Sequence, residues 1–296
     1  MRLPYAAQVA EECDVAVVCL GLSSILEGEE GDSAGAAGFR GGDREMLNLP
    51  GDQQRLLEAV AASGTQVVLV LMSGGALDVA WAQDSPKVPS ILQAWYPGQR
   101  GGTAVGDVLF GAYCPAGRLP VTFYRTLDDL PPFEDYSMEG RTYRFFKGEP
   151  LYPFGYGLSY SRFEYFELEA PSEPVPMGEN VHVNVEVTNS GGMDADEVVQ
   201  VYITDLEASD RVPVRSLMGV ERIFLKQGET KTVYFRLSPR DLSMVRADGT
   251  RVLEPGEFEV SIGGKQPGFT GHRDAVTTAA LTGRFQITGE EMVIEK

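Results

Sequence analysis

Three glutamates, Glu27, Glu29 and Glu30, crowd into one short glycine-rich stretch of this 296-residue chain. A carboxyl group that keeps its proton near neutral pH can act as a general acid. Like charges held close together raise the pKa of a carboxyl group, as does burial beneath a ligand. The cluster therefore suggests acid chemistry, and a solvated acidic loop without chemical function is the alternative that the charges alone leave open.

The elements on either side of these glutamates place them in a long loop at the edge of a sheet. An apolar run over Val15–Leu20 predicts a buried strand before the loop, and apolar residues at helical spacing predict a helix over Gln53–Ala62 after it. Ligands of open α/β sheets bind at the carboxyl ends of the strands. Loops longer than about a dozen residues inside a compact domain are usually functional or disordered.

Strands and helices go on alternating through the first part of the chain. This alternation is typical of an α/β domain whose mostly parallel sheet is covered on both faces, and we assign it to residues 1–124. Two glycine-rich turns within it, Ser73-Gly74-Gly75 and Gly98-Gln99-Arg100-Gly101-Gly102, lack the spacing of a phosphate-binding loop. A close approach of the backbone to the sheet, a neighbouring domain or a sugar explains their glycines better. The further predicted elements are strands over Val67–Leu71, Pro89–Trp95 and, at the sheet edge, Leu119–Phe123, and helices from the Ser73-Gly74-Gly75 turn to Trp81 and over Thr103–Phe110.

The second part of the chain changes character twice. Residues 125–177 are rich in Pro, Gly and aromatic side chains and read as a linker, whose aromatics between Tyr143 and Tyr160 either stack sugars or pack as structural contacts. From residue 178 the apolar period becomes two, as at Val181, Val183, Val185 and Val187. Short strands separated by turn signals indicate a fibronectin type III-like β-sandwich over residues 178–296, to which Gly283–Ile287 adds an edge strand.

Composition excludes several classes of partner and cofactor. The formal charge of −18 argues against nucleic acid and anionic membranes, because phosphate binding needs clustered Lys and Arg. Cys13, Cys19 and Cys114 have no metal-ligand spacing and are predicted to be small buried thiols. His182 and His272 lie far from the glutamate loop in sequence, and we predict no metal and no cofactor. We find no signal-like apolar segment at the N-terminus and no membrane span.

Several motifs, occurring together and in order, give nearly the whole chain a resemblance to the C-terminal part of family 3 glycoside hydrolases. The variant with two glutamates after Leu-Glu-Gly is most similar to the β-xylosidase and β-glucosidase branch. The motifs are Gly21-Leu22-Ser23, Leu26-Glu27-Gly28-Glu29-Glu30, Gly38-Phe39-Arg40-Gly41-Gly42-Asp43-Arg44, Leu49-Pro50, Ala94-Trp95-Tyr96-Pro97-Gly98, Pro115-Ala116-Gly117-Arg118-Leu119-Pro120 and Leu151-Tyr152-Pro153-Phe154-Gly155-Tyr156-Gly157-Leu158-Ser159-Tyr160.

The resemblance implies a retaining β-glycosidase that releases terminal β-linked glucose or xylose. In this family a TIM barrel supplies an aspartate nucleophile and the following α/β domain supplies the acid/base glutamate. Matching the loop places the acid/base at Glu29, with Glu27 as second choice, and Trp95 and Tyr96 are the predicted substrate-binding residues. Asp43 and Arg44 are expected to form an ion pair that anchors the loop. Family members are often secreted or periplasmic.

This chain is expected to depart from the family pattern, since the sequence from Met1 onward contains no segment that would form the barrel. We therefore expect no turnover unless a barrel is supplied in trans or by a longer chain. One alternative is a non-catalytic carbohydrate-binding or scaffolding module that uses the aromatic run. Another is a structural pair of domains that docks an exposed apolar face on another subunit.

Overall fold

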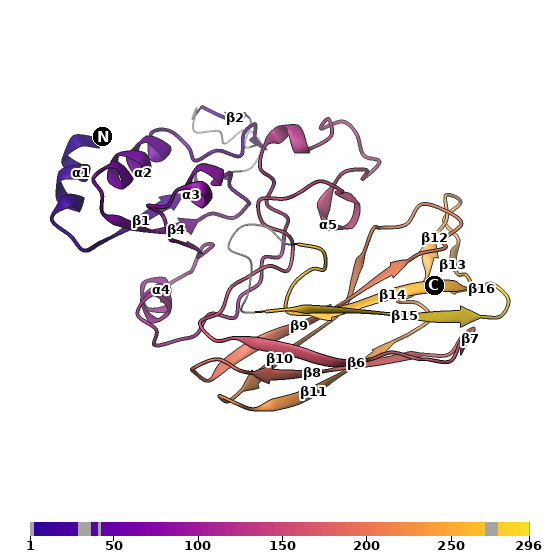
Figure 1. The fold of residues 1–296 in the computed structure, drawn as a ribbon. Coiled ribbons are helices and arrows are strands. Elements are labelled where there is room, and N and C mark those ends of the chain that lie inside the picture. The colour runs from indigo at the N-terminus through magenta and orange to yellow at the C-terminus, as the bar shows by residue number, and fades with distance from the viewer. Residues whose placement is uncertain (1–2, 29–36, 41–42, 270–277, 296) are drawn as a thin grey trace. The chain divides into compact units, whose positions relative to one another are not determined.

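The computed structural model describes residues 3–28, 37–40, 43–269 and 278–295, and these form two compact units. The first unit comprises residues 1–112 and 123–130, and the second comprises residues 113–122 and 131–296. Figure 1 shows the elements of each unit along the chain. The domain limits 1–124, 125–177 and 178–296 stay a prediction. No helix of the described residues is long and apolar enough to cross a membrane.

The first unit is built on a three-stranded parallel sheet in the order β1-β4-β5. This confirms the predicted α/β class with a parallel sheet. The apolar centre of β4 and the inner face of α2 are buried together, with Leu57, Val67 and Leu69 fully inaccessible. The elements are α1 (Leu3–Glu11), β1 (Val15–Gly21), β2 (Phe39–Arg40), β3 (Asp43–Arg44), α2 (Gln53–Ala62), β4 (Gln66–Met72), α3 (Ala80–Asp84), β5 (Ser90–Gln93), α4 (Gly101–Leu109) and a short 3-10 turn (Leu127–Asp129).

One face of β1 is not covered by the described residues, which corrects the expectation of a sheet buried on both sides. Val15 and Val17 are 50% and 51% exposed. Cys19 continues this row and is exposed, as is Cys13, so the prediction of buried thiols holds only for Cys114. The physical reason is that β1 is the edge strand of the sheet, and its alternate side chains find no helix on that face.

Two further predictions for this part of the chain were wrong. The residues after Gly75 stay in a loop until Ala80, because Asp78 bridges to Asn48 and accepts a hydrogen bond from the Ala80 N–H at 2.9 Å. No strand forms over Leu119–Phe123. Leu119 instead exchanges backbone hydrogen bonds with Gly155 and Tyr156 in the second unit, at 2.7 and 2.9 Å.

The second unit is a β-sandwich, as predicted. A five-stranded sheet in the order β10-β9-β14-β15-β7 and a three-stranded sheet in the order β11-β8-β6 enclose one apolar core. The four alternating valines of β8 are all buried to 1% exposure or less. The elements are α5 (Thr142–Phe145), β6 (Phe163–Glu169), β7 (Val175–Pro176), β8 (Val181–Asn189), β9 (Ala195–Asp205), β10 (Ser216–Leu225), β11 (Thr230–Leu237), β12 (Met244–Val245), β13 (Arg251–Leu253), β14 (Gly256–Gly263), β15 (Ala280–Thr288) and β16 (Met292–Val293).

The strand expected at the tail of the chain forms as β15, which pairs with β14 along its length. On its other side only Ile287 and Thr288 pair, with the two-residue strand β7. The strand β7 escaped the sequence analysis because a strand so short carries no alternation. β15 is therefore followed by β7 in the strand order, but β7 pairs with its last two residues only.

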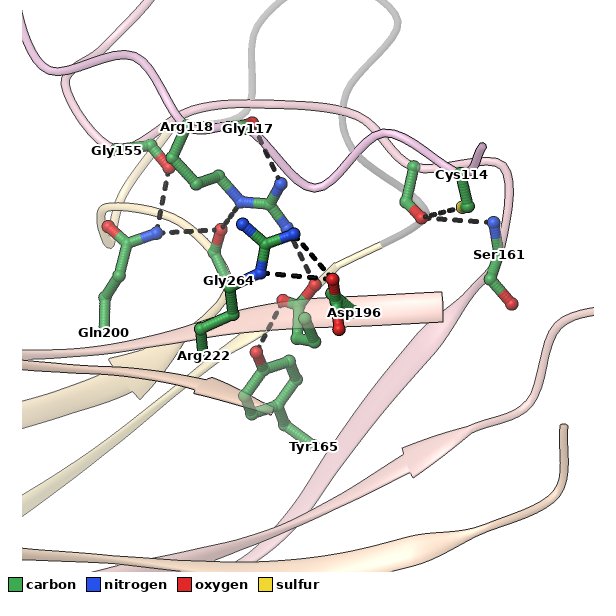
Figure 2. Close-up of polar contacts among 12 residues, drawn as sticks. Cys114, Gly117, Arg118, Gly155, Ser161, Tyr165, Asp196, Gln200, Arg222 and Gly264 are labelled. Carbon is green, nitrogen blue, oxygen red and sulfur yellow. Dashed lines mark hydrogen bonds and ion pairs between the residues drawn. The ribbon is translucent and has the colours of Figure 1, made fainter. Parts of the chain in front are cut away.

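A buried ion pair fastens residues 113–122 to the sandwich (Figure 2). The Arg118 guanidinium donates to Glu197 Oε2 at 2.7 Å and to the Gly264 carbonyl at 2.9 Å. The Tyr165 hydroxyl donates to the other carboxylate oxygen of Glu197 at 2.6 Å. Burial raises the pKa of Glu197, although Arg118 and Tyr165 oppose this shift. The segment thus acts as part of the sandwich core.

Many of the aromatic side chains between Tyr143 and Tyr160 pack within the second unit. Tyr143 stacks on Phe154 with ring centroids 4.1 Å apart and meets the edge of Tyr202. Tyr156 lies between Tyr152 and Phe269 in a small buried cluster. These contacts support the structural explanation of the aromatic run for the residues named here.

Candidate active site

Loops from the carboxyl ends of all three parallel strands meet at one carboxylate, that of Glu27. Glu27 follows β1, Gly74 follows β4, and Tyr96 follows β5. The backbone N–H of Glu27 donates to the Ser23 carbonyl at 3.0 Å, which closes a tight turn at the start of the loop. Because parallel strands end on the same edge, three loops distant in sequence reach the same point.

The Glu27 carboxylate is held by one donor from each of the neighbouring loops. Its Oε2 atom accepts a hydrogen bond from the Gly74 N–H at 2.9 Å and a short one from the Tyr96 hydroxyl. Hydrogen bonds to an ionised acceptor are about twice as strong as neutral ones. The loop that carries the glutamate cluster is therefore anchored at Glu27.

The groups around the glycine pair after β4 leave little room for a side chain there. A Cβ atom on Gly74 would lie 2.8 Å from Glu27 Oε2, and one on Gly75 would lie 3.3 Å from Arg44 Nη1. Real Cβ atoms do not approach other atoms as closely as 2.8 Å. The backbone at Gly74 thus approaches the side chain of Glu27 closely, a partner that the sequence analysis did not name.

Arg44, which follows the glutamate loop in the sequence, binds the backbone next to the Gly74-Gly75 turn. From β3, its guanidinium donates to the Ala76 carbonyl at 2.9 Å and to those of Met46 and Leu47 at 3.3 Å each. Burial lowers its pKa, while the negative charge of Glu27 favours its protonated form. Asp43 and Arg44 form no ion pair in the described part of the chain. The expected pairing was wrong because Arg44 binds backbone carbonyls instead.

Tyr96 is a firm hydrogen-bond donor in this arrangement. Burial, followed by its hydrogen bond to Glu27, raises the pKa of Tyr96 to about 12. The hydroxyl therefore keeps its proton throughout the physiological range. Although 45% of the side chain is exposed, its polar end is committed to Glu27.

Comparison with known proteins identifies the family. Residues 2–160 match the glycosyl hydrolase family 3 C-terminal domain, and residues 197–266 match the fibronectin type III-like domain. The chain belongs to glycoside hydrolase family 3. This confirms the resemblance found in the sequence motifs.

The relatives in family 3 include β-xylosidases and β-glucosidases. A xylan 1,4-β-xylosidase of Xylanibacter ruminicola is 44% identical over 83% of this chain and 28% of its own length. A periplasmic β-glucosidase of Salmonella typhimurium is 36% identical over 87% of this chain and 34% of its own length. This chain thus spans about a third of the length of these relatives.

Solved family 3 structures share the fold. A β-glucosidase from Erythrobacter marinus superposes with a TM-score of 0.79 at 33% identity, covering 97% of this chain and 36% of that one. The β-glucosidase of Kluyveromyces marxianus, solved in complex with glucose, gives a TM-score of 0.80 at 29% identity, covering 98% of this chain and 34% of that one. The arrangement of an α/β unit followed by a fibronectin-like sandwich is thus that of family 3 enzymes.

The structure brings together two of the four predicted site residues. Glu27 and Tyr96 are in direct contact, whereas Trp95 meets the edge of Phe123 at 6.4 Å between ring centroids. Trp95 adopts a left-handed backbone with φ of 53°, an unusual conformation for a bulky residue. Glu29, the first choice for the acid/base, lies outside the described residues, as does Glu30.

Sequence analysis missed the role of Gly74 and the backbone partners of Arg44. The position of Gly74 in the sequence was a usable signal. It follows β4, the strand that pairs with β1, and parallel neighbouring strands end at the same sheet edge. Arg44 gave a weaker signal, because its three acceptors are backbone carbonyls that no side-chain pattern reports. The described residues hold no group of three or more His, Cys, Asp or Glu side chains that could bind a metal ion.

Proposed function

We propose that this chain supplies the acid/base glutamate of a retaining β-glycosidase that releases terminal β-linked glucose or xylose. The nucleophile comes from a TIM-barrel domain, in trans or in a longer chain. Glu29 is the acid/base residue, and Glu27 anchors its loop. The names of the relatives, β-xylosidases and β-glucosidases, support this choice of substrates.

The observation that carries the proposal is the anchoring of the Glu27 carboxylate by Gly74 and Tyr96. The described stem of the loop is held at Glu27 by the two neighbouring loops. Catalytic groups need such support, because a misplacement of about 1 Å can cost about a hundredfold in rate. Glu29 lies two residues beyond the anchor.

The contacts of Glu27 favour Glu29 over Glu27 as the acid. Retaining hydrolysis needs one carboxyl group that protonates the leaving oxygen and a second that attacks the anomeric carbon, about 5–5.5 Å apart. Oε2 of Glu27 already accepts two hydrogen bonds within the unit. Glu27 therefore has a positioning role, and Glu29 provides the proton.

The magnitude of general acid catalysis explains why the chain alone should be inactive. A positioned general acid contributes about 10² to 10⁴-fold, whereas enzymes as a whole accelerate reactions by about 10⁶ to 10¹⁷-fold. An acid without a nucleophile or a closed sugar subsite cannot supply the remainder. Turnover thus depends on the barrel.

Complementation with a barrel domain tests the proposal. The chain is mixed with a separately expressed family 3 barrel, and hydrolysis of p-nitrophenyl β-xyloside and β-glucoside is measured for each component and for the mixture. We expect activity only in the mixture, and a loss of about 10² to 10⁴-fold with Glu29→Gln. Glu12→Gln, which removes an exposed carboxylate after α1, is the matched control and should change nothing.

Two outcomes would contradict the proposal. Full activity of the Glu29→Gln mixture would remove Glu29 from the chemistry. Silence in every mixture, with the chain folded and bound to the barrel, would favour a non-catalytic carbohydrate-binding or scaffolding module.

A further inference from the structure

The second unit contains a cavity of about 490 Å³ whose lining residues all belong to that unit. It lies between the segment that follows α5, the residues just before β10 and the loop that follows β14. Cavities of about 300 to 1,000 Å³ are typical of small-molecule sites. The aromatic side chains in its wall are Tyr143, Phe146 and Phe269.

The wall of the cavity is tied together by hydrogen bonds. The Val214 N–H donates to the Arg144 carbonyl at 2.7 Å, and the Leu217 N–H donates to the Tyr143 hydroxyl at 3.2 Å. The ring of Tyr143 is further fixed by stacking on Phe154. These contacts join α5 to the start of β10, so the cavity has a preorganised frame.

One cation in the wall, Arg215, is half-buried. Burial lowers the pKa of Arg215, and the nearby groups of Tyr202 and Glu259 oppose this shift. Within the described residues Arg215 forms no ion pair and donates no hydrogen bond. The other charged residues in the wall are Lys147 and Glu149, so cations outnumber carboxylates there. Partial burial removes water from the Arg215 guanidinium, which makes an anionic ligand favourable at this place.

Two side chains in the wall also hold polar atoms without partners. Thr122 Oγ1 and Gln266 Oε1 are buried and have no hydrogen-bond partner among the residues that the structure describes. Such groups are rare in folded proteins and call for a missing partner. A hydroxyl rotor and the broad terminal torsion of glutamine both adjust easily to a ligand hydroxyl.

We propose that this cavity binds a carboxylated sugar of the hexuronic acid class. Arg215 pairs with the carboxylate, because a planar guanidinium matches a carboxylate with two parallel hydrogen bonds. The rings of Tyr143, Phe146 and Phe269 contact the apolar face of the sugar. Thr122 and Gln266 bind its hydroxyls. This site does not depend on the proposed acid/base function, since it uses no residue of the first unit.

Calorimetric titration of the full chain with D-glucuronate tests this inference without any glycosidase assay. D-glucose, which lacks the carboxylate, and acetate, which lacks the sugar ring, serve as probes of each half of the ligand. We expect D-glucuronate to bind at least about tenfold more tightly than either, since a charged hydrogen-bonded pair contributes about that factor. Arg215→Met should weaken D-glucuronate binding by a similar factor.

Matched variants separate the site from general effects of charge. Arg236→Met removes an exposed guanidinium of β11 outside the cavity and should leave the affinity unchanged. Lys147→Met removes an exposed cation of the cavity wall and leaves the packed core unchanged. If Arg215→Met disturbs folding, Lys147→Met still tests the inference, because it should weaken D-glucuronate binding in a folded chain.

Three results would overturn the inference. One is the absence of any heat of D-glucuronate binding at tens of millimolar. A second is equal affinity for acetate and D-glucuronate, because the cavity would then hold only an anion. A third is tighter binding of glucose 6-phosphate than of D-glucuronate, which would assign the cavity to a sugar phosphate.

Discussion

Glu27 illustrates how a single carboxylate can organise three loops. Its oxygen takes one donor from the loop after β4 and one from the loop after β5. Because the Gly74 N–H and the Tyr96 hydroxyl share this acceptor, a change to either donor alters the hydrogen bond of the other. The protonation of Tyr96 therefore reports on the state of the whole anchor.

A spectroscopic titration of Tyr96 tests the anchor at the residue scale. Subtracting the phenolate absorbance of Tyr96→Phe from that of the unmodified chain isolates this side chain. We expect a midpoint near pH 12, because burial and Glu27 raise the pKa of Tyr96 to about 12. Since the folded pKa lies above the usual value of about 10, this group also makes the fold less stable as the pH rises from about 10 to 12. A midpoint at pH 10 would contradict the contact.

Gly74→Ala should release the anchor. Its Cβ would lie 2.8 Å from Glu27 Oε2 and 3.2 Å from the Tyr96 ring, so the carboxylate must move away. We expect the pKa of Tyr96 to fall toward its ordinary value, measured by the same difference titration on the Gly74→Ala background.

Gly102→Ala is the control for this substitution. No atom lies within 4 Å of a Cβ placed on Gly102, which belongs to helix α4. Its Tyr96 titration should match that of the unmodified chain. An unchanged Tyr96 pKa in Gly74→Ala would show that the turn yields without displacing Glu27.

At the scale of elements, β9 carries two ion pairs of very different burial on adjacent residues. Glu197 and Arg118 are 0% and 6% exposed, whereas Asp196 and Arg222 are 22% and 54% exposed. Removing one partner of a buried pair costs about 3–5 kcal/mol, because it strands a charge. An exposed pair contributes about 0–1 kcal/mol.

We therefore expect Arg118→Met to lower the free energy of unfolding of the second unit by about 3–5 kcal/mol and Arg222→Met by about 1 kcal/mol or less. Urea unfolding followed by circular dichroism measures both. Adding Glu197→Gln to Arg118→Met should recover part of the loss, since the stranded charge is then absent. Equal losses for the two arginine variants would contradict the assignment of the buried pair as the fastening of residues 113–122.

The same pair makes a prediction for pH. Burial already raises the pKa of Glu197 with Arg118 present, and losing that cation raises it further. A carboxyl group whose folded pKa exceeds its unfolded one destabilises the fold as it ionises, so stability falls as the pH rises above about 4.5. The loss in the free energy of unfolding caused by Arg118→Met should therefore be smaller at pH 5 than at pH 8. A deficit that grows on acidification would contradict this.

The elements that the sequence predicts well are those whose side-chain pattern reflects a single buried face. Helix α2 has the predicted bounds, Gln53–Ala62, and the alternating valines of β8 are buried as their spacing predicts. The burial of β1 was predicted wrongly, because an apolar run does not tell whether a neighbour covers it. The anchor of Glu27 was missed for a related reason, since Gly74 donates to Glu27 from its backbone N–H and Arg44 binds backbone carbonyls.

At the scale of the whole molecule, the chain belongs to family 3 and spans about a third of the length of its β-xylosidase and β-glucosidase relatives. Its own residues explain how a glutamate loop is anchored on a sheet edge. The identity of the sugar substrate and the source of the nucleophile are part of the proposed function. Function therefore has to be tested with the barrel present.

The most direct test of the acid/base claim is the dependence of kcat/KM on the leaving group in the reconstituted enzyme. Protonation by an acid matters for a sugar leaving group and little for dinitrophenolate. We predict that Glu29→Gln lowers kcat/KM for xylobiose or cellobiose by about 10² to 10⁴-fold, while kcat/KM for the matching 2,4-dinitrophenyl glycoside changes by less than about tenfold. An equal fall for both substrates would contradict the account, because Glu29 would then not be the proton donor.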